Sequence, residues 1–355
     1  MTERPPNLFD FATSELSQDA FLCWLIQWAD TKYNKVDPVL HQTGMDFLKS
    51  ISVKHEKNSQ KDPLKEAISL EVEVRRQHKK IDVLALISKE EKKYVLVIED
   101  KINSFMHSKQ LSRYRRIAKD DFNDHDPLLV YFKTGGIQRA AKAENDGYIV
   151  YSRRDFLDAL KPYAEETKDS ILRDYYQRLK LMDDHYQQYH TTPLKKWDKP
   201  KRAWEGFFGE LRERMGREIG MNLVYWQFVN NPSGGETMFG ISHEVGEFQL
   251  HLQLVKKWGG NKRHFLAFRI GNVDKDRREV RGNFHRSFIR HAEISGWGGK
   301  FGRPGRWGNG NWMVIAESTE GNDWLPTDIN GKIDIKGTVE KLKKVYKMLC
   351  EFKYK

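Results

Sequence analysis

The stretch YVLVIEDKINS, Tyr94 to Ser104, decides how the first part of the chain folds. Its first five residues are apolar and rich in β-formers, which is typical of a central strand buried on both faces. A strand of this kind ordinarily ends in a Gly, Asn or Pro turn, but this one runs into Glu99, Asp100 and Lys101. Three charges at the end of a buried strand need partners, and a neighbouring strand can supply them.

The preceding apolar run, KKIDVLALIS, is separated from this stretch only by the charged residues KEEK, which predicts a β-hairpin. If Ser88 pairs with Lys93, Asp82 lies directly opposite Glu99. Directly opposed residues share a face, with Cβ atoms ~4.5–5.5 Å apart. Lys101 projects from the same face because it follows Glu99 by two residues. A register slip of one residue would place the two acids on opposite faces.

Two carboxylates held this close repel each other, so positive charge should compensate them. Lys101 supplies one charge, and a divalent cation between Asp82 and Glu99 would complete the neutralisation. Hard cations such as Mg²⁺ favour carboxylate oxygens and water, and often use only one or two protein carboxylates. The pattern therefore favours a Mg²⁺ site at the end of the hairpin, with Mn²⁺ as the alternative ion.

The spacing D82-x16-E99-D100-K101 resembles the D…(D/E)xK signature of the PD-(D/E)xK nuclease superfamily. The resemblance implies that Asp82 and Glu99 are catalytic metal ligands and that Lys101 is the catalytic lysine, which assists the attacking water or the phosphate. The backbone carbonyl of Asp100 is a further candidate ligand, whereas its side chain alternates to the other face. Ile81 departs from the Pro in the family's name.

Two more features fit the same family. Gln110 and Tyr114 share one face of a predicted helix, and they resemble the QxxxY motif of RecB-like and lambda-exonuclease-like members, which implies contact with the substrate backbone. Glu15 fits the extra acid that some members supply from the first helix to the metal site, although an acid in a first helical turn is also explained by the helix dipole. The opening NLFDFATSELSQDAFLCWLIQW is similar to the start of a bacterial subfamily of nucleases in this superfamily.

Each residue alone also has a structural explanation. Asp82 could cap a turn, and Glu99 with Lys101 could form a solvated strand end with a cross-strand ion pair. Short motifs often mislead. The functional interpretation therefore depends on the whole set, which occurs in order on the expected elements.

The element order predicts an α/β (α+β) fold with a mixed sheet flanked by helices, restriction-endonuclease-like by resemblance. Predicted helices and strands follow the hydrophobic periodicity: in the first part, helices over 13–30, 107–120, 154–164 and 171–189, with strands over 69–76, 79–88, 93–101, 127–134 and 148–152; in the second part, strands over 222–229, 248–255, 264–271 and 311–318, with a closing helix over 338–352.

Composition divides the chain. Residues 1–190 carry 31 Lys and Arg and 31 Asp and Glu, whereas residues 191–355 carry 30 and 19, together with 22 of the 26 glycines and eight of the ten tryptophans. We therefore predict a catalytic domain over 1–190 and a basic, Gly/Trp-rich, β-rich α+β domain over 191–355. The polar stretch HTTPLKKWDKPKR, at 190–202, marks the boundary.

Residues 277–312 of the second domain interleave Arg and Lys with Trp, Phe and Gly. Cations meet phosphates, and aromatic faces stack on unpaired bases. This composition favours a nucleic-acid-binding or recognition domain, although core aromatics with solvated basic turns would give the same letters.

The sequence thus predicts a Mg²⁺-dependent nuclease, a phosphodiester hydrolase, with DNA as its substrate by resemblance. The alternatives are a non-catalytic nucleic-acid-binding protein and a partner- or ligand-sensing protein on a nuclease-like fold. Cys23 and Cys350 form no CxxC or Cys/His cluster, which suits a reducing cytoplasm. Neither a secretory signal nor a membrane span is expected, so we predict a cytoplasmic protein without a membrane partner.

Overall fold

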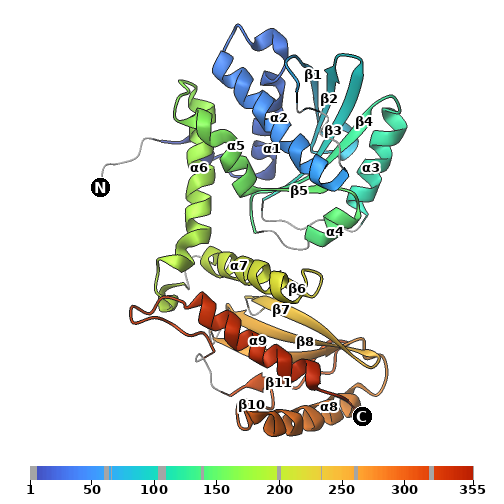
Figure 1. Ribbon diagram of the computed structural model, residues 1–355, viewed down its shortest axis with the longest axis vertical. Coiled ribbons are helices and arrows are strands. Elements are labelled where there is room, and N and C mark those ends of the chain that lie inside the picture. The colour runs from blue at the N-terminus through green and yellow to red at the C-terminus, as the bar shows by residue number, and fades with distance from the viewer. Residues whose placement is uncertain are drawn as a thin grey trace. The chain divides into compact units, whose positions relative to one another are not determined.

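The computed structural model of the protein describes residues 6–59, 64, 66–102, 109–136, 140–197, 201–232, 234–259, 263–319 and 324–354. They form two compact units, Met1–Asp184 and His185–Lys355 (Figure 1). The division falls in the last turn of helix α6 (Ser170–Gln187), whereas the boundary predicted from composition lies at 190–202. Each unit has its own sheet and its own apolar core.

The first unit contains a five-stranded mixed sheet in the order β1-β2-β3-β4-β5. The first three strands pair antiparallel, and β4 and β5 continue the sheet parallel to β3. The predicted mixed sheet flanked by helices is therefore confirmed. The strands are β1 (Glu71–Arg76), β2 (Val83–Lys89), β3 (Lys92–Lys101), β4 (Asp126–Lys133) and β5 (Ile149–Ser152). The helices are α1 (Glu15–Trp28), α2 (Pro38–Ser59), α3 (Gln110–Asp121), α4 (Ala140–Asn145), α5 (Arg153–Ala164) and α6.

Two apolar layers enclose this sheet. Helices α1, α2, α5 and α6 pack on one face, and α3 packs on the other (Figure 1). Alternation along β3 decides which residue meets which layer, so that Ile98 lies in the α1 layer and Val97 lies in the α3 layer. By the same alternation, Asp100 belongs to the α1 face, and Glu99 and Lys101 belong to the α3 face.

The β2–β3 hairpin has the predicted register. Ser88 pairs with Lys93. The connecting turn is only two residues long, shorter than the four-residue KEEK linker, and it begins at Glu90 with a φ of 55°. Extending this register by one pair brings Asp82, the residue before β2, level with Glu99.

The second unit contains a six-stranded sheet in the order β10-β11-β9-β8-β7-β6, in which every pairing is antiparallel. Its main core joins one face of the sheet to three helices. The predicted β-rich second domain is thereby confirmed as a fold class. The strands are β6 (Val224–Val229), β7 (Glu236–Val245), β8 (Phe248–Lys257), β9 (His264–Gly271), β10 (Phe301–Gly302) and β11 (Met313–Ser318). The helices are α7 (Arg202–Ile219), α8 (Arg277–Ala292) and α9 (Ile335–Glu351).

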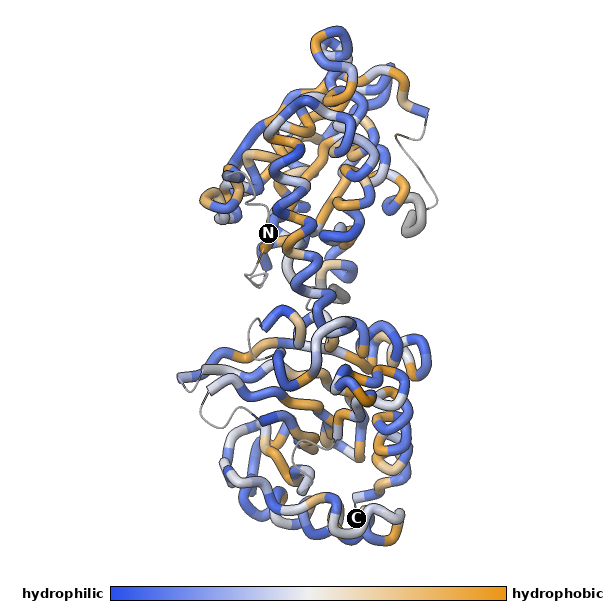
Figure 2. The backbone as a smooth tube through the Cα atoms, turned by 90° about the vertical axis from the view of Figure 1, so that its left-hand side faces the viewer, coloured by the Kyte–Doolittle hydropathy of each residue, from blue (hydrophilic) through white to orange (hydrophobic). Residues whose placement is uncertain are grey.

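The helices of both units are amphipathic, as the alternation of orange and blue along them in Figure 2 shows. Six helices and strands of the described ranges were not expected from the sequence, namely α2, α4, α7, β7, α8 and β10. Helix α8 is difficult to recognise because its buried apolar stripe is short, with Phe284, Phe288 and Ala292 among many arginines. No helix in the described ranges is both long and apolar enough to cross a membrane.

Candidate active site

The charged end of β3 forms a compact cluster with the residue that precedes β2. The Lys101 ammonium lies 2.5 Å from Glu99 Oε1 and 3.4 Å from Asp82 Oδ2, and it donates a hydrogen bond to the Asp100 carbonyl at 2.7 Å. Asp82 Oδ2 also accepts the backbone N–H of Asp100 at 3.0 Å. The hairpin register therefore brings Asp82, Glu99 and Lys101 together, while the Asp100 carbonyl, a candidate ligand, accepts from Lys101.

Glu99 is the most deeply buried member of this cluster. Its exposure is 0%, and within the described residues neither of its carboxylate oxygens accepts a well-formed hydrogen bond, although Oε1 touches Lys101. The pKa of Glu99 is raised to about 8. Burial is the main cause, the charge of Lys101 opposes the rise, and the charge of Asp82 contributes to it. Burial lowers the pKa of Lys101, but Glu99 and Asp82 together raise it above its ordinary value. A single ammonium thus lies between two acids, and the raised pKa shows that it does not fully offset the cost of burying the Glu99 carboxylate.

The Asp100 side chain projects to the other face of the sheet, as alternation requires. It is 1% exposed, and its Oδ1 accepts a hydrogen bond from Gln18 Nε2 on α1 at 2.5 Å. Burial, and then the charge of Asp19, hold the pKa of Asp100 well above its ordinary value. A second pair of buried acids, Asp19 and Asp100, therefore lies directly behind the first.

Sequence reasoning missed Asp19. The residue is 2% exposed, and its Oδ2 accepts a hydrogen bond from Gln77 Nε2 at 3.3 Å. Burial raises the pKa of Asp19 to about 6, and the charge of Asp82 adds to the effect. Helical periodicity could have found it. Gln18 and Asp19 follow Glu15 by one helical turn, and they lie on the buried side of α1 together with Phe21 and later apolar residues.

Glu15 reaches the same end of β3 from the first turn of α1. The helix begins there because the Ser14 side chain caps it, accepting the backbone N–H of Ser17. Glu15 Oε1 accepts the backbone N–H of Ile102 at 2.8 Å. Its charge also contributes to the raised pKa values of Asp100 and Lys101. Glu15 thus lies beside the cluster, in addition to complementing the helix dipole.

Gln110 and Tyr114 lie together on α3, and they support the loop that carries Asp82. Gln110 Nε2 donates to the Tyr114 hydroxyl at 3.0 Å, and that hydroxyl donates to the backbone carbonyl of Lys80. Tyr114 is 1% exposed. In this structure the pair anchors the chain two residues before Asp82, and contact with substrate stays a prediction.

That loop has an unusual backbone. Gln77, Lys79 and Lys80 have φ values of 56°, 48° and 71°, in the left-handed region that favours glycine. Such residues cost on the order of 1–3 kcal/mol each and persist where the surrounding structure over-determines them. Here the Tyr114 hydroxyl holds the Lys80 carbonyl, and Asp121 on α3 accepts from Lys79 Nζ at 2.7 Å. Backbone strain is therefore concentrated immediately before Asp82.

The residues fit a divalent cation in a limited way. In the described ranges, no three Asp, Glu, His or Cys side chains converge closely enough to hold a metal by themselves. The chain instead offers the two carboxylates of Asp82 and Glu99, and the buried Oε2 atom of Glu99 accepts no hydrogen bond from the described residues. Mg²⁺ commonly uses one or two carboxylates and keeps several waters. This donor set is therefore of the kind that Mg²⁺ requires.

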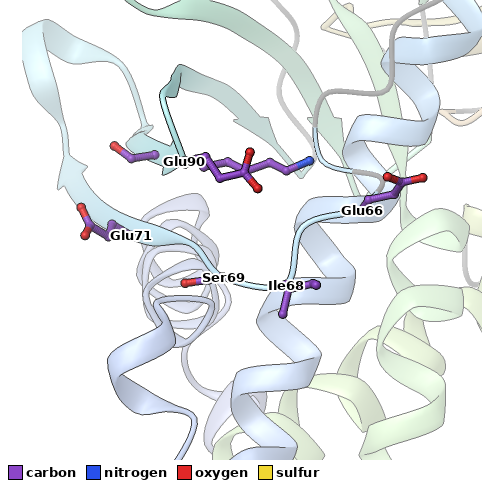
Figure 3. Close-up of a pocket in the computed structure, with 7 residues that line it drawn as sticks. Glu66, Ile68, Ser69, Glu71 and Glu90 are labelled. Carbon is purple, nitrogen blue, oxygen red and sulfur yellow. The ribbon is translucent and has the colours of Figure 1, made fainter.

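A separate hollow of about 360 Å³ lies beside the beginning of β1 and the β2–β3 turn. Figure 3 shows Glu66, Glu71 and Glu90 around it. None of the candidate catalytic residues lines this hollow. It therefore belongs to the opposite end of the hairpin and is not part of the candidate site.

Comparisons with known proteins agree with the geometry. The family model described as the PD-(D/E)XK nuclease superfamily matches residues 6–203. Searches among curated proteins and among solved structures find no match. The family match covers more than half of the chain and includes every candidate residue named above. The chain therefore belongs to the PD-(D/E)XK nuclease superfamily.

Proposed function

We propose that this protein is a Mg²⁺-dependent nuclease that hydrolyses phosphodiester bonds in DNA. One observation carries the proposal: Asp82 and Glu99 share a single ammonium, that of Lys101, and the buried Glu99 Oε2 accepts no hydrogen bond from the described residues. Membership of a nuclease superfamily gives that unbalanced acid pair a chemical purpose. DNA is chosen over RNA by the family resemblance.

Asp82 and Glu99 would hold the cation, with Mn²⁺ as the alternative ion and Glu15 as a supplementary acid. A divalent cation supplies Lewis acidity there, since it lowers the pKa of a coordinated water and offsets charge on phosphoryl oxygens. Glu99 is fixed by its place in a central strand, so it needs no reorganisation to serve as a ligand.

Lys101 would act as the catalytic lysine. Contacts to Glu99, to Asp82 and to the Asp100 carbonyl keep its ammonium protonated and fixed in direction. A fixed ammonium can orient the attacking water and offset the charge that develops on the phosphoryl group. Gln110 and Tyr114 would hold the Asp82 loop in place, and we infer that they also lie near the bound strand.

The proposal is tested by incubating the full chain with plasmid, linear duplex, single-stranded DNA and RNA, each with Mg²⁺, Mn²⁺ or EDTA. We expect metal-dependent cleavage of DNA and none in EDTA. Asp82→Asn and Lys101→Met should each lower the cleavage rate by about 10³-fold, the size of effect seen when one transition-state contact is removed. Glu71→Gln is the matched control, because it removes an exposed acid of β1, which lies beside the other end of the hairpin in the same sheet.

Two results would contradict the proposal. Cleavage that persists in EDTA, or that Asp82→Asn leaves unchanged, would show that the acid pair is not the site. Nucleic-acid binding without cleavage in any metal would instead support a non-catalytic binding protein on a nuclease fold.

A further inference from the structure

Arg281, in the second turn of α8, is buried, and two of its guanidinium nitrogens have no hydrogen-bond partner among the described residues. The residue is 1% exposed, and its Nε and Nη1 atoms make no hydrogen bond. It forms no ion pair with any acid of the described ranges. Its guanidinium carbon lies 4.0 Å from the centroid of the Trp307 ring. A guanidinium carries five N–H donors and keeps its charge at all ordinary pH values. Arg281 therefore has buried donors that only an additional acceptor can satisfy.

Arg153 in the first unit provides an internal comparison. It is also buried, but it lies 2.9 Å from Asp183, and it donates to the Thr134 carbonyl. The buried Arg153 thus has an acid as its partner. Arg281 lacks that acid, so packing alone does not explain it.

More positive charge surrounds Arg281. The guanidinium carbon of Arg303 lies 4.7 Å from the centroid of the same Trp307 ring. Burial lowers the pKa of Arg281, and the positive charges of Arg303 and Arg278 lower it as well. Arg278 and Arg303 are exposed, and neither pairs with an acid in the described part of the chain. The ring of His285, one helical turn beyond Arg281, lies 5.4 Å from Trp307. Two guanidiniums therefore stack on one indole ring, and the charge of Arg278 acts on one of them.

This arrangement is unfavourable in an isolated protein. Like charges repel, and a cation–π contact is weaker than the cost of desolvating an unpaired charge. An anion that reached all three guanidiniums would remove both costs. Planar guanidinium forks match the oxygens of phosphate and form paired hydrogen bonds with them.

The loop that carries Arg303 and Trp307 leaves room for such an anion. Gly305 and Gly308 have no other atoms near the position that a Cβ would occupy. Their lack of side chains is not required by packing, and glycine allows close approach of a ligand to the backbone. The space around these two glycines is therefore open.

We propose that Arg281 and Arg303, which stack on Trp307, form a phosphate-binding site in the second unit together with the neighbouring Arg278, and that its occupant is a phosphate group of a nucleic acid. The assignment of the occupant rests on the proposed nuclease function. The location of the charge agrees with it, since residues 191–355 carry the whole excess of Lys and Arg over Asp and Glu. Phosphate contacts of this kind position the nucleic acid and do not read its sequence.

The test is a binding titration of the full chain in EDTA, which separates binding from cleavage. The probes are a fluorescent single strand and duplex, each with and without a 5′-phosphate, at several salt concentrations. The variants are Arg281→Met and the exposed double variant Arg278→Gln/Arg303→Gln. Arg290→Gln is the matched control, because it removes one exposed and unpaired charge from the same helix.

We expect the double variant to weaken binding at least about tenfold and to reduce the slope of log affinity against log salt by about 2, since each duplex phosphate contact contributes about 0.9. Arg290→Gln should change the affinity less than twofold. If Arg281→Met fails to fold, as judged by its melting temperature, the exposed double variant still decides the result. Equal binding by the double variant and the control would overturn the proposal.

Inorganic phosphate distinguishes the source of the ligand. Phosphate at millimolar concentration should raise the melting temperature of the wild-type chain more than that of Arg281→Met, because a ligand stabilises the state that binds it. If phosphate stabilises the wild type but the variants bind DNA normally, the nucleic-acid assignment is overturned in favour of a free phosphate. Salt-dependent binding that needs the three arginines, without any cleavage, would support this site while contradicting the proposed nuclease function.

Discussion

The two units bury unbalanced charge of opposite sign. In the first unit, Asp82 and Glu99 share one ammonium, and a second acid pair lies behind them. In the second unit, Arg281 and its arginine neighbours share no acid at all in the described ranges. The first unit is electrically neutral overall, so its imbalance is local, whereas the second carries the whole net charge of +11. The comparison is the basis of the two proposals, since an excess of buried acid favours a cation as ligand in one unit and an excess of buried arginine favours an anion in the other.

The largest expected effect is the change in stability when the buried cation is removed from each unit, Lys101 from the first and Arg281 from the second. Lys101 compensates two acids, so Lys101→Met should destabilise the metal-free protein by about 3 kcal/mol, since breaking a buried ion pair leaves uncompensated charge. Arg281 compensates nothing, so Arg281→Met should leave the free energy of unfolding unchanged or higher. Urea titrations of both variants in EDTA, beside the wild type, provide the measurement.

Equal losses of stability in the two variants would refute the comparison. Such a result would mean that Arg281 stabilises the second unit by packing on Trp307. Lys101→Arg serves as the control for charge, because it retains the positive charge while changing the shape of the donor.

A smaller effect concerns protonation in the second unit, where further positive charge should be unfavourable. Burial and the charge of Arg269 lower the pKa of His251 to about 4. The folded state therefore favours neutral His251, and this stability is complete above the ordinary pKa of 6.5 and is lost as pH falls toward 4. We expect the free energy of unfolding to fall by about 2 kcal/mol from this residue between pH 7 and pH 5.

The measurement is denaturant unfolding followed by tryptophan fluorescence, which reports mainly on the second unit because eight of the ten tryptophans lie in residues 191–355. In His251→Gln this part of the pH dependence should be absent. The glutamine can still bond the hydroxyls of Tyr225 and Ser242, which lie 3.1 and 3.2 Å from His251 Nδ1. An unchanged pH dependence would show that His251 is not the responsible group.

The smallest effect concerns backbone strain, which differs between the two sites. The loop with Arg303 is rich in glycine, whereas the turn before Asp82 places Lys80 at a φ of 71°. Lys80→Gly should therefore stabilise the protein by up to about 1 kcal/mol, because glycine adopts this conformation without strain. Lys80→Ala keeps the strain and should give no gain. Melting temperatures of the two variants decide the matter, and a higher value for the alanine variant would contradict the strain.

The sequence predicts the hairpin and its acid pair well, because both depend on local signals. Two continuous apolar runs with a short charged linker allow few registers, and the observed pairing of Ser88 with Lys93 is the one predicted. Gln110 and Tyr114 were likewise placed together by helical spacing alone. Their support of the Lys80 carbonyl could not be predicted, since it depends on how α3 packs against a loop distant in sequence.

Other parts of the molecule depend on tertiary contacts that leave weak traces in the sequence. Asp19 was missed because a polar residue on an amphipathic helix is usually solvated, and its burial against Asp100 arises only when α1 packs on the sheet. The arginine cluster was recognised as composition but not as a site. Its members belong to a helix that was not predicted and to a loop, and only the fold brings Arg281 to Trp307.

The two-residue turn at Glu90 has a consequence for the evolution and engineering of this protein. Strands β2 and β3 are mostly apolar on both faces, so the core itself distinguishes poorly between neighbouring registers. Whether Asp82 lies opposite Glu99 then depends on the number of residues in the turn. One inserted residue that shifted the pairing would separate the acids onto opposite faces without altering any of them. The length of the turn in this hairpin therefore determines whether the candidate site forms. A shift of the pairing by an odd number of residues places the two acids on opposite faces, whereas a shift by an even number keeps them on one face.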